Sequence, residues 1–308
     1  MTLLPEAEVL RKELEKEVVG QRIKEVTIRS GDLPDPRAGA PDDLGGTQSP
    51  RGDPASAHDP ADLSDLAAAL EGERIEAVIR RGTHLAFRLK DGKALVIRSG
   101  SIATFTRQPV HADDHRERSP ASHSQLEIVF AFEGGGAFHC LDVEQSGMVR
   151  LITIDEFNDS PEFTPIGMDP FTNTPTWLEF SRQLSIRNCR LRALLGDETF
   201  VVGLGAVYSD EILWAAGLSG MRSSARLSAQ EVRRLYRAIQ EVLHEAVKQA
   251  RGASDPTDED LFEDPLSRQH LKVYGRAGQP CARCRQRIVF EQIDAPPVAS
   301  YFCPNCQT

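Results

Sequence analysis

Four cysteines near the end of the chain stand in two closely spaced pairs. Cys281 and Cys284 form one C-x-x-C pair, and Cys303 and Cys306 form another after eighteen intervening residues. Two residues between thiols let both sulfur atoms of a pair point at one tetrahedral ion, and the intervening length suits a β-hairpin. Free or redox-active cysteines are the alternative, which two matched pairs disfavour. We predict one structural zinc ion per chain, closed by four thiolates and taking no part in catalysis.

The remaining cysteines and the start of the chain bear on the compartment. Cys140 and Cys189 have apolar sequence neighbours and are expected to be core thiols rather than disulfide partners. No stretch of 18 apolar residues is present, and the first turns of the chain are charged. We therefore predict no membrane span, no signal peptide and a cytoplasmic protein, which we expect to be a monomer.

The net charge has to be located before a nucleic-acid partner is considered. The 308 residues carry a formal net charge of −10, which is unusual for a DNA-binding protein. Residues 31–65 and 253–264 each carry −6, so the rest of the chain carries +2. Residues 265–308 hold six Lys and Arg against two acids. A basic face for double-stranded DNA is compatible with this distribution, and the acidic segments are candidates for contact with a protein partner.

The first half of the chain predicts a helix followed by an antiparallel β-sandwich. Val9, Leu10, Leu14 and Val18 recur at helical spacing, so a helix is expected from about Glu6. Strand-like runs separated by turn residues follow and favour a sandwich. These runs are 22–29, 74–81, 84–90, 93–99, 126–133 and 137–143.

The second half is predicted to be helical. A turn at Gly203-Leu204-Gly205 separates a helix that begins near residue 191 from one at 208–216. Asp210 and Glu211 are expected as caps or dipole partners of the latter. A longer helix is expected from Ser228 to Gln249, because Ser228 and Glu231 have the spacing of a capping box. Its predicted buried stripe is Val232, Leu235, Ile239, Val242, Leu243 and Ala246.

These elements give an α+β chain of three domains. Residues 1–160 form the N-terminal β-sandwich with its first helix, and within them 31–62 are rich in Pro, Gly and Asp and are expected to be a disordered insertion. Residues 161–262 form the helical domain, and 263–308 form a β-hairpin zinc finger.

Several segments resemble one known family in the same order along the chain. They include LPEAEVLRKELEKEVVGQRIKEV at 4–26, RRGTHLAFRL at 80–89, LLGDETFVVGLGAVYSDEILWAAGL at 194–218 and YFCPNCQ at 301–307. The chain is similar to the Fpg/Nei DNA glycosylases, nearest to the actinobacterial formamidopyrimidine-DNA glycosylases. The resemblance implies a helix-two-turns-helix domain and a DNA-binding cleft between this domain and the sandwich. It also implies excision of a flipped base by an N-terminal amine, with subsequent strand cleavage.

Most functional positions of that family are occupied here by other residues. Thr2 stands for the proline whose amine is the nucleophile, and Leu3 for the glutamate that handles protons. Thr83 replaces the lysine of the RRGK motif, Ala206 the asparagine of GLGN, and Val298 the arginine at the hairpin tip. The residues that would fill the space left by a flipped base are also small or polar, and are Ser101, Gln145 and Gly147, or Ser146 after a one-residue shift.

A few family positions keep their character. Glu6 and Tyr208 keep the family's identity, and Arg192 replaces a lysine that lies near phosphate. The resemblance implies DNA contacts by Arg192, Tyr208 and Arg81. Glu6 is a catalytic candidate, or a first-turn acid favoured by the helix dipole. Arg192 and Arg81 are alternatively solvated charges.

Three hypotheses follow for the function. The first is a DNA-binding relative that is defective in base excision and serves DNA repair or damage recognition. The second is an active glycosylase or abasic-site lyase that uses the Thr2 α-amine, a group with a pKa near 8 that is partly neutral at pH 7. The third is a protein-interaction scaffold that does not bind DNA. The retained zinc finger and helical frame favour the first, and the lost catalytic positions favour a pseudoenzyme.

Overall fold

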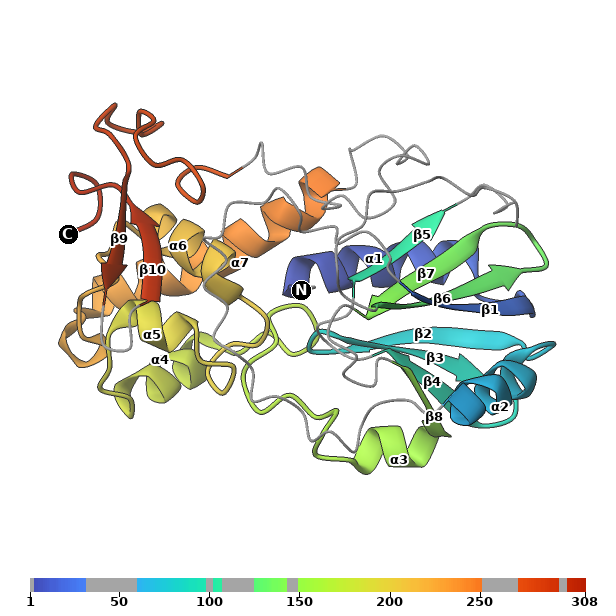
Figure 1. The fold of residues 1–308 in the computed structure, drawn as a ribbon. Helices are drawn as coiled ribbons and strands as arrows, with labels where there is room; N and C mark the ends of the chain where they lie inside the picture. Colours follow the sequence, from blue (N-terminus) through green and yellow to red (C-terminus); the bar gives the residue numbers. More distant parts are fainter. Residues whose placement is uncertain are drawn as a thin grey trace.

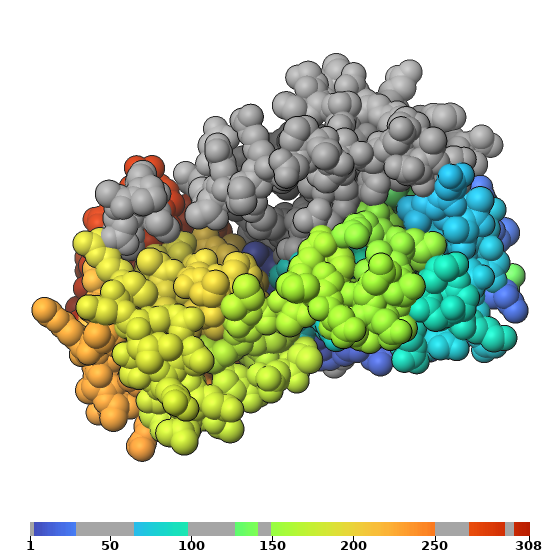
Figure 2. All heavy atoms as spheres, turned by 90° about the horizontal axis from the view of Figure 1, so that it is seen from below, coloured from blue at the N-terminus to red at the C-terminus, as the bar shows by residue number. Residues whose placement is uncertain are grey.

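The computed structural model describes residues 3–31, 60–97, 102–106, 125–142, 149–250, 271–293 and 298–308. Figure 1 shows two lobes, a β-sandwich and a helical lobe that carries the C-terminal hairpin. In Figure 2 the green segment that follows the last strand of the sandwich runs along the sandwich to the yellow helical lobe. None of the helices within the described ranges has the length and apolarity that crossing a membrane requires.

The sandwich consists of two antiparallel four-stranded sheets, in the orders β1-β6-β7-β5 and β2-β3-β4-β8. Alternate residues of β6 and β7, such as Phe130 and Phe138, face Phe87 and Leu95 of the opposite sheet, and the Phe87 and Phe138 rings lie 5.2 Å apart. The predicted sandwich is thus confirmed. Its strands are β1 (Ile23–Gly31), β2 (Ile75–Arg81), β3 (His84–Leu89), β4 (Lys93–Ile97), β5 (Ile102–Thr106), β6 (Gln125–Phe132), β7 (Ala137–Asp142) and β8 (Val149–Thr153).

Helix α1 (Leu4–Glu17) belongs to both lobes. Pro5 lies in its first turn, where a missing amide costs nothing, and the helix begins two residues before the predicted start. Leu4 is fully buried in the core of the helical lobe, whereas Leu10 and Leu14 are buried in the core of the sandwich. Figure 1 shows α1 running from one lobe into the other. The first helix therefore joins the two lobes through its own apolar face.

Helix α2 (Pro60–Leu70) was not predicted. It packs Leu66 and Leu70 against the sandwich core. The insertion expected at 31–62 is therefore too long at both ends, since Gly31 closes β1 and Pro60 opens α2. Its other residues, 32–59, lie outside the described residues, as does the acidic segment 253–264.

Short helices build the helical lobe around the long helix α7. The predicted capping box is present, since Ser228 Oγ accepts the Glu231 amide at 3.3 Å and the Glu231 carboxylate accepts the Ser228 amide at 2.8 Å. The predicted stripe of α7 is buried, with Val242 partly so. The helical lobe contains α4 (Trp177–Ser185), α5 (Leu191–Leu195), α6 (Gly205–Ala216), a 3₁₀ turn (Ser224–Arg226) and α7 (Ala229–Ala250), whereas α3 (Ile154–Asp159) packs Phe157 against the sandwich (Figure 1).

A buried ionic network connects the lobes. The Arg80 side chain on β2 is 1% exposed and donates to Glu8 of α1 at 2.8 Å and to Asp169 of the helical lobe at 2.6 and 3.1 Å. It also donates to the carbonyl of Gly82 at 2.6 Å and to the hydroxyl of Thr172 at 2.8 Å. Every side of the guanidinium fork therefore has an acceptor, as a buried charge requires.

The pKa of Glu8 shows how strongly this network favours the charged carboxylate. Burial alone would raise the pKa of Glu8, but hydrogen bonds from Arg11, Arg80 and Lys12 outweigh it and lower the pKa from 4.5 to about 2. A lowered pKa in the folded state means that Glu8 stabilises the fold fully above about pH 4.5. This contribution is lost as the pH falls towards 2.

We expect Arg80→Met to lower the free energy of unfolding by about 3–5 kcal/mol, because it leaves Asp169 buried without its cation and removes one of the three cations that pair with Glu8. Urea unfolding followed by circular dichroism measures the change. Arg88→Met is the matched control, since Arg88 and its partner Glu76 are each 44% exposed and such pairs contribute at most about 1 kcal/mol. Equal effects of the two substitutions would show that the network does not join the lobes.

Candidate functional site

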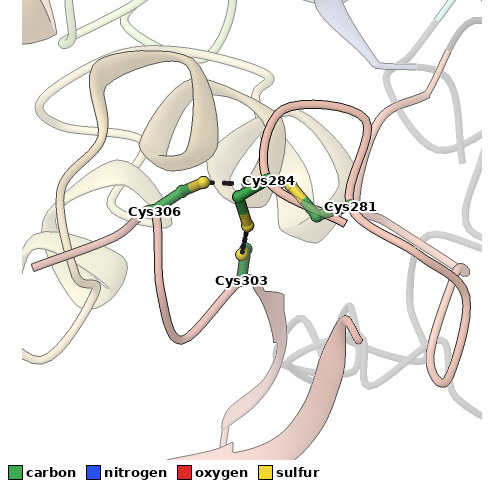
Figure 3. Close-up of side chains that lie close together, drawn as sticks. All are labelled: Cys281, Cys284, Cys303 and Cys306. Carbon is green, nitrogen blue, oxygen red and sulfur yellow. Dashed lines mark hydrogen bonds between the residues drawn. The ribbon is translucent and has the colours of Figure 1, made fainter. Parts of the chain in front are cut away.

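The four clustered cysteines form a metal centre at the base of the C-terminal hairpin, which comprises β9 (Val289–Ile293) and β10 (Val298–Phe302). All four sulfur atoms lie within 4.8 Å of one another, with Cys284 and Cys303 at 3.4 Å and Cys281 and Cys306 at 3.9 Å. Figure 3 shows their side chains pointing at a common centre. Tetrahedral zinc with Zn–S bonds of about 2.3 Å requires sulfur separations of about 3.8 Å. The residues fit zinc, and the predicted structural zinc site is confirmed.

Two carboxylates of α6 hold the zinc finger in place. Glu211 accepts the backbone amides of Lys272, Val273 and Tyr274 at 2.8 to 3.0 Å. Asp210 accepts the amide of Tyr301 at 2.7 Å, among other donors. The expectation that Asp210 and Glu211 serve as caps or dipole partners of α6 is therefore wrong. Their oxygen atoms face the zinc finger, a long-range contact that spacing along one helix does not reveal.

A second cluster lies where the two lobes meet. The amide of Leu4 donates to the carbonyl of Gly203 at 2.8 Å, which ties the start of α1 to the turn before α6. A Cβ added to Gly203 would lie 2.7 Å from the Thr83 methyl, and one at Gly205 would lie 2.7 Å from the Leu3 side chain. Both glycines have positive φ, which other residues rarely adopt. The turn thus brings Leu3, Thr83 and the start of α6 together.

The chemistry of this junction is mainly apolar. Leu3 is partly buried against the core of the helical lobe, and Ala206 packs against the apolar cluster around the hairpin. Glu6 accepts a hydrogen bond from the Tyr208 hydroxyl at 3.2 Å. Thr2 lies outside the described residues, and the side chain of Val298, the first residue of β10, is also outside them.

Glu198 is a junction residue that sequence reasoning missed. Its carboxylate accepts the Gly203 amide at 3.0 Å, so it reaches the turn that contacts Leu4 and Thr83. Desolvation against the turn raises the pKa of Glu198, with a further increase from Asp197 and an opposing effect of the Gly203 amide. An acid next to a Gly-rich turn in the sequence was the available signal.

Of the three residues predicted to contact DNA, two are buried, and all three bind other residues of the chain. Arg192 is 4% exposed, and its Nε lies 2.9 Å from Asp210, whose pKa burial raises to about 6 despite this pairing. Tyr208 is 1% exposed. Arg81 is half-buried, donates to carbonyls of α3 and stacks on Phe157 at 5.0 Å. The alternative of a solvated Arg192 is thus wrong, because a hairpin distant in sequence covers it. Contacts of these three residues with DNA stay a prediction.

Comparison with known proteins identifies the family. Residues 1–149 match the formamidopyrimidine-DNA glycosylase N-terminal domain, and residues 166–257 match the formamidopyrimidine-DNA glycosylase H2TH domain. The formamidopyrimidine-DNA glycosylase of Heliobacterium modesticaldum is 31% identical over the full length of both chains. That of Thermus thermophilus is 30% identical over 100% of this chain and 98% of the relative. The chain belongs to the Fpg family.

Solved structures of Fpg proteins share the fold described above. Fpg of Lactococcus lactis, in a complex with DNA that contains an abasic site, matches with a TM-score of 0.73 at 26% identity over 99% of both chains. MutM (Fpg) of Thermus thermophilus matches with a TM-score of 0.69 at 29% identity, over 99% of this chain and 98% of that chain. The predicted α+β architecture of sandwich, helix-two-turns-helix domain and zinc finger is confirmed.

We expect Cys303→Ser to lose stoichiometric zinc and to unfold the hairpin, because structural zinc in such sites contributes on the order of 10 kcal/mol. Atomic emission measures the zinc content, and limited proteolysis measures the order of the hairpin. Cys189→Ser is the control, since Cys189 is a partly buried thiol outside the cluster. Natural protein prepared without chelators that holds no zinc would contradict this assignment.

Proposed function

We propose that this chain is a DNA-binding Fpg-family protein that has lost base excision and acts in the recognition of damaged DNA. The observation that carries the proposal is the environment of Leu3. The side chain at the position of the family's proton-handling glutamate lies against Gly205 and the apolar core of the helical lobe. A hydrocarbon there exchanges no protons, and general acid–base help contributes about 10²–10⁴-fold to such reactions.

The other replaced positions support the same proposal. Thr83 brings a hydroxyl where the family has a lysine, and its methyl group fills the space beside Gly203. Ala206 packs beneath the hairpin instead of offering an amide to a phosphate. The fold-forming residues around them, including the zinc ligands and the Arg80 network, are intact. This contrast supports selection for the fold and its binding surface rather than for the reaction.

DNA binding is supported by the relatives and by exposed cations of the zinc finger. Lactococcus lactis Fpg forms a complex with DNA containing an abasic site, and a MutM matching with a TM-score of 0.70 at 26% identity, over 99% of both chains, forms one with DNA containing carbocyclic 8-oxo-G. Lys272, Arg285 and Arg287 are exposed on the zinc finger of this chain. As exposed cations they are able to contact phosphate groups of DNA.

A second candidate function is an abasic-site lyase that uses the Thr2 α-amine. The carboxylates of Glu6 and Glu198 near the start of α1 favour it, since each is able to move a proton. An abasic site carries no base to extrude, so the absence of wedge residues matters less there. We also propose the actinobacterial type for this chain, on its motifs alone.

We expect the purified protein to excise neither oxidised purines nor oxidised pyrimidines from duplex DNA. Lesion-containing and abasic duplexes are incubated with the natural protein and with a Thr2→Pro, Leu3→Glu double variant, with and without borohydride. Lactococcus lactis Fpg serves as the positive control for the assay. Borohydride trapping on abasic DNA alone would establish the lyase function. Lesion excision by the natural protein within tenfold of the double variant or of the control would sink the proposal.

We expect weak, salt-sensitive DNA binding that depends on exposed arginines of the zinc finger. Arg285→Ala with Arg287→Ala should lower affinity for all sequences alike and reduce the salt slope by about two, because each phosphate contact contributes about 0.9. Fluorescence anisotropy at several salt concentrations measures both quantities. Arg88→Ala, an exposed arginine of the sandwich, is the control and should change neither. Absence of binding at low salt would favour the protein-interaction scaffold.

A further inference from the structure

The zinc centre contacts the last turn of α6 through a tryptophan. The indole N–H of Trp214 donates to the Sγ of Cys281 at 3.3 Å, and the backbone amide of Arg283 donates to the same sulfur atom at 3.4 Å. Cys281 is fully buried, and Trp214 is partly buried in the apolar cluster around the cysteines. One zinc ligand is therefore held by a side chain of the helical lobe, outside the zinc finger itself.

Arg283 holds that tryptophan in place. It stands between the two cysteines of the first pair, and its guanidinium lies 4.3 Å from the centre of the Trp214 ring. It also donates to the carbonyls of Trp214 at 3.2 Å and Ala215 at 3.4 Å. These carbonyls belong to the helix end, where the backbone lacks intrahelical donors and a cation is favoured. The end of α6 thus donates a hydrogen bond to the first cysteine pair and accepts hydrogen bonds from the arginine between those cysteines.

The second cysteine pair reaches the same helix end. Gln307 accepts the amide of Cys303 at 2.8 Å and donates to the carbonyl of Leu218 at 3.2 Å. Gly217 closes α6 with a φ of +66°, and a Cβ there would lie 3.3 Å from the carbonyl oxygen of Cys306. Only a residue without a side chain fits this approach comfortably. Both halves of the metal centre are consequently attached to one helix terminus.

We propose that Trp214 is a positioning residue of the zinc centre, which couples retention of zinc to the packing of the hairpin on α6. A thiolate bound to zinc carries negative charge, and a hydrogen bond donated to it stabilises that state. Loss of a residue that orients a metal ligand typically costs 10–100-fold in metal affinity. This inference does not depend on whether the protein excises bases.

The chain supplies its own matched control in Trp177. The sequence contains two tryptophans in all, and Trp177 on α4 also lies under an arginine, with the Arg233 guanidinium 5.6 Å from its ring. Its ring packs on Tyr236 at 5.9 Å. Each single Trp→Phe variant therefore leaves one tryptophan with an arginine over it, and Trp214 is the one bonded to a zinc ligand.

The test compares zinc release from the full-length natural protein, Trp214→Phe and Trp177→Phe. Excess pyridylazoresorcinol captures the released zinc and reports its rate by absorbance. We expect release from Trp214→Phe to be at least about tenfold faster, because phenylalanine keeps the ring beneath Arg283 but removes the N–H donor. Release from Trp177→Phe should equal that of the natural protein.

A second measurement decides the question if Trp214→Phe fails to fold. In Trp177→Phe the fluorescence comes from Trp214 alone, and its emission should shift when a chelator removes zinc and should return when zinc is restored. Equal release rates from the two variants, or an emission of Trp214 that is the same with and without zinc, would overturn the proposal.

Discussion

Burying a guanidinium costs several kcal/mol unless acceptors surround it, and Arg80 is buried at the place where the two lobes meet. Its acceptors come from α1, from the turn after β2 and from the segment before α4. These parts of the chain are held together because each of them supplies an acceptor to the buried charge. The turn at Thr83 is thereby placed against Gly203, and the start of α1 against α6. The buried ion and the apolar contacts of α1 together hold the junction in this geometry.

Helix α6 has the corresponding role for the zinc finger. Asp210, Glu211 and Trp214 contact the zinc finger, whereas Tyr208 contacts Glu6 of α1. In the function proposed above, Tyr208 keeps its identity and position 192 keeps its cation, although most reactive groups of the family are replaced. Burial explains this retention without reference to catalysis. Removing either residue would leave a buried partner unsatisfied, a cost that applies to an inactive protein as much as to an active one.

The sequence predicted what depends on short-range spacing. The C-x-x-C pairs, the capping box at Ser228 and the alternation of the long strands all act within a few residues, and the structure contains each of them. Strand β8 was not predicted from the sequence. Only one of its five side chains, Val149, is fully buried, so the alternation of buried and exposed residues is weak.

The sequence did not predict the pairing of Arg192 with Asp210, for a different reason. The two residues are on separate helices, and the hairpin that covers Arg192 comes about a hundred residues later in the chain. A charge on a helix reads as solvated until its partner is known. The junction itself was anticipated only through family resemblance, because nothing in the spacing of Leu3, Thr83 and Gly205 reveals that they meet.

The position of α1 in both cores has a consequence for how the molecule tolerates a broken backbone. Leu4 is packed in the helical lobe, while Leu10 and Leu14 are packed in the sandwich. A cut between α3 and Asp169 would leave each fragment with apolar surface that the other fragment covers, together with one side of the Arg80 network. The two pieces are therefore expected to stay associated after such a cut.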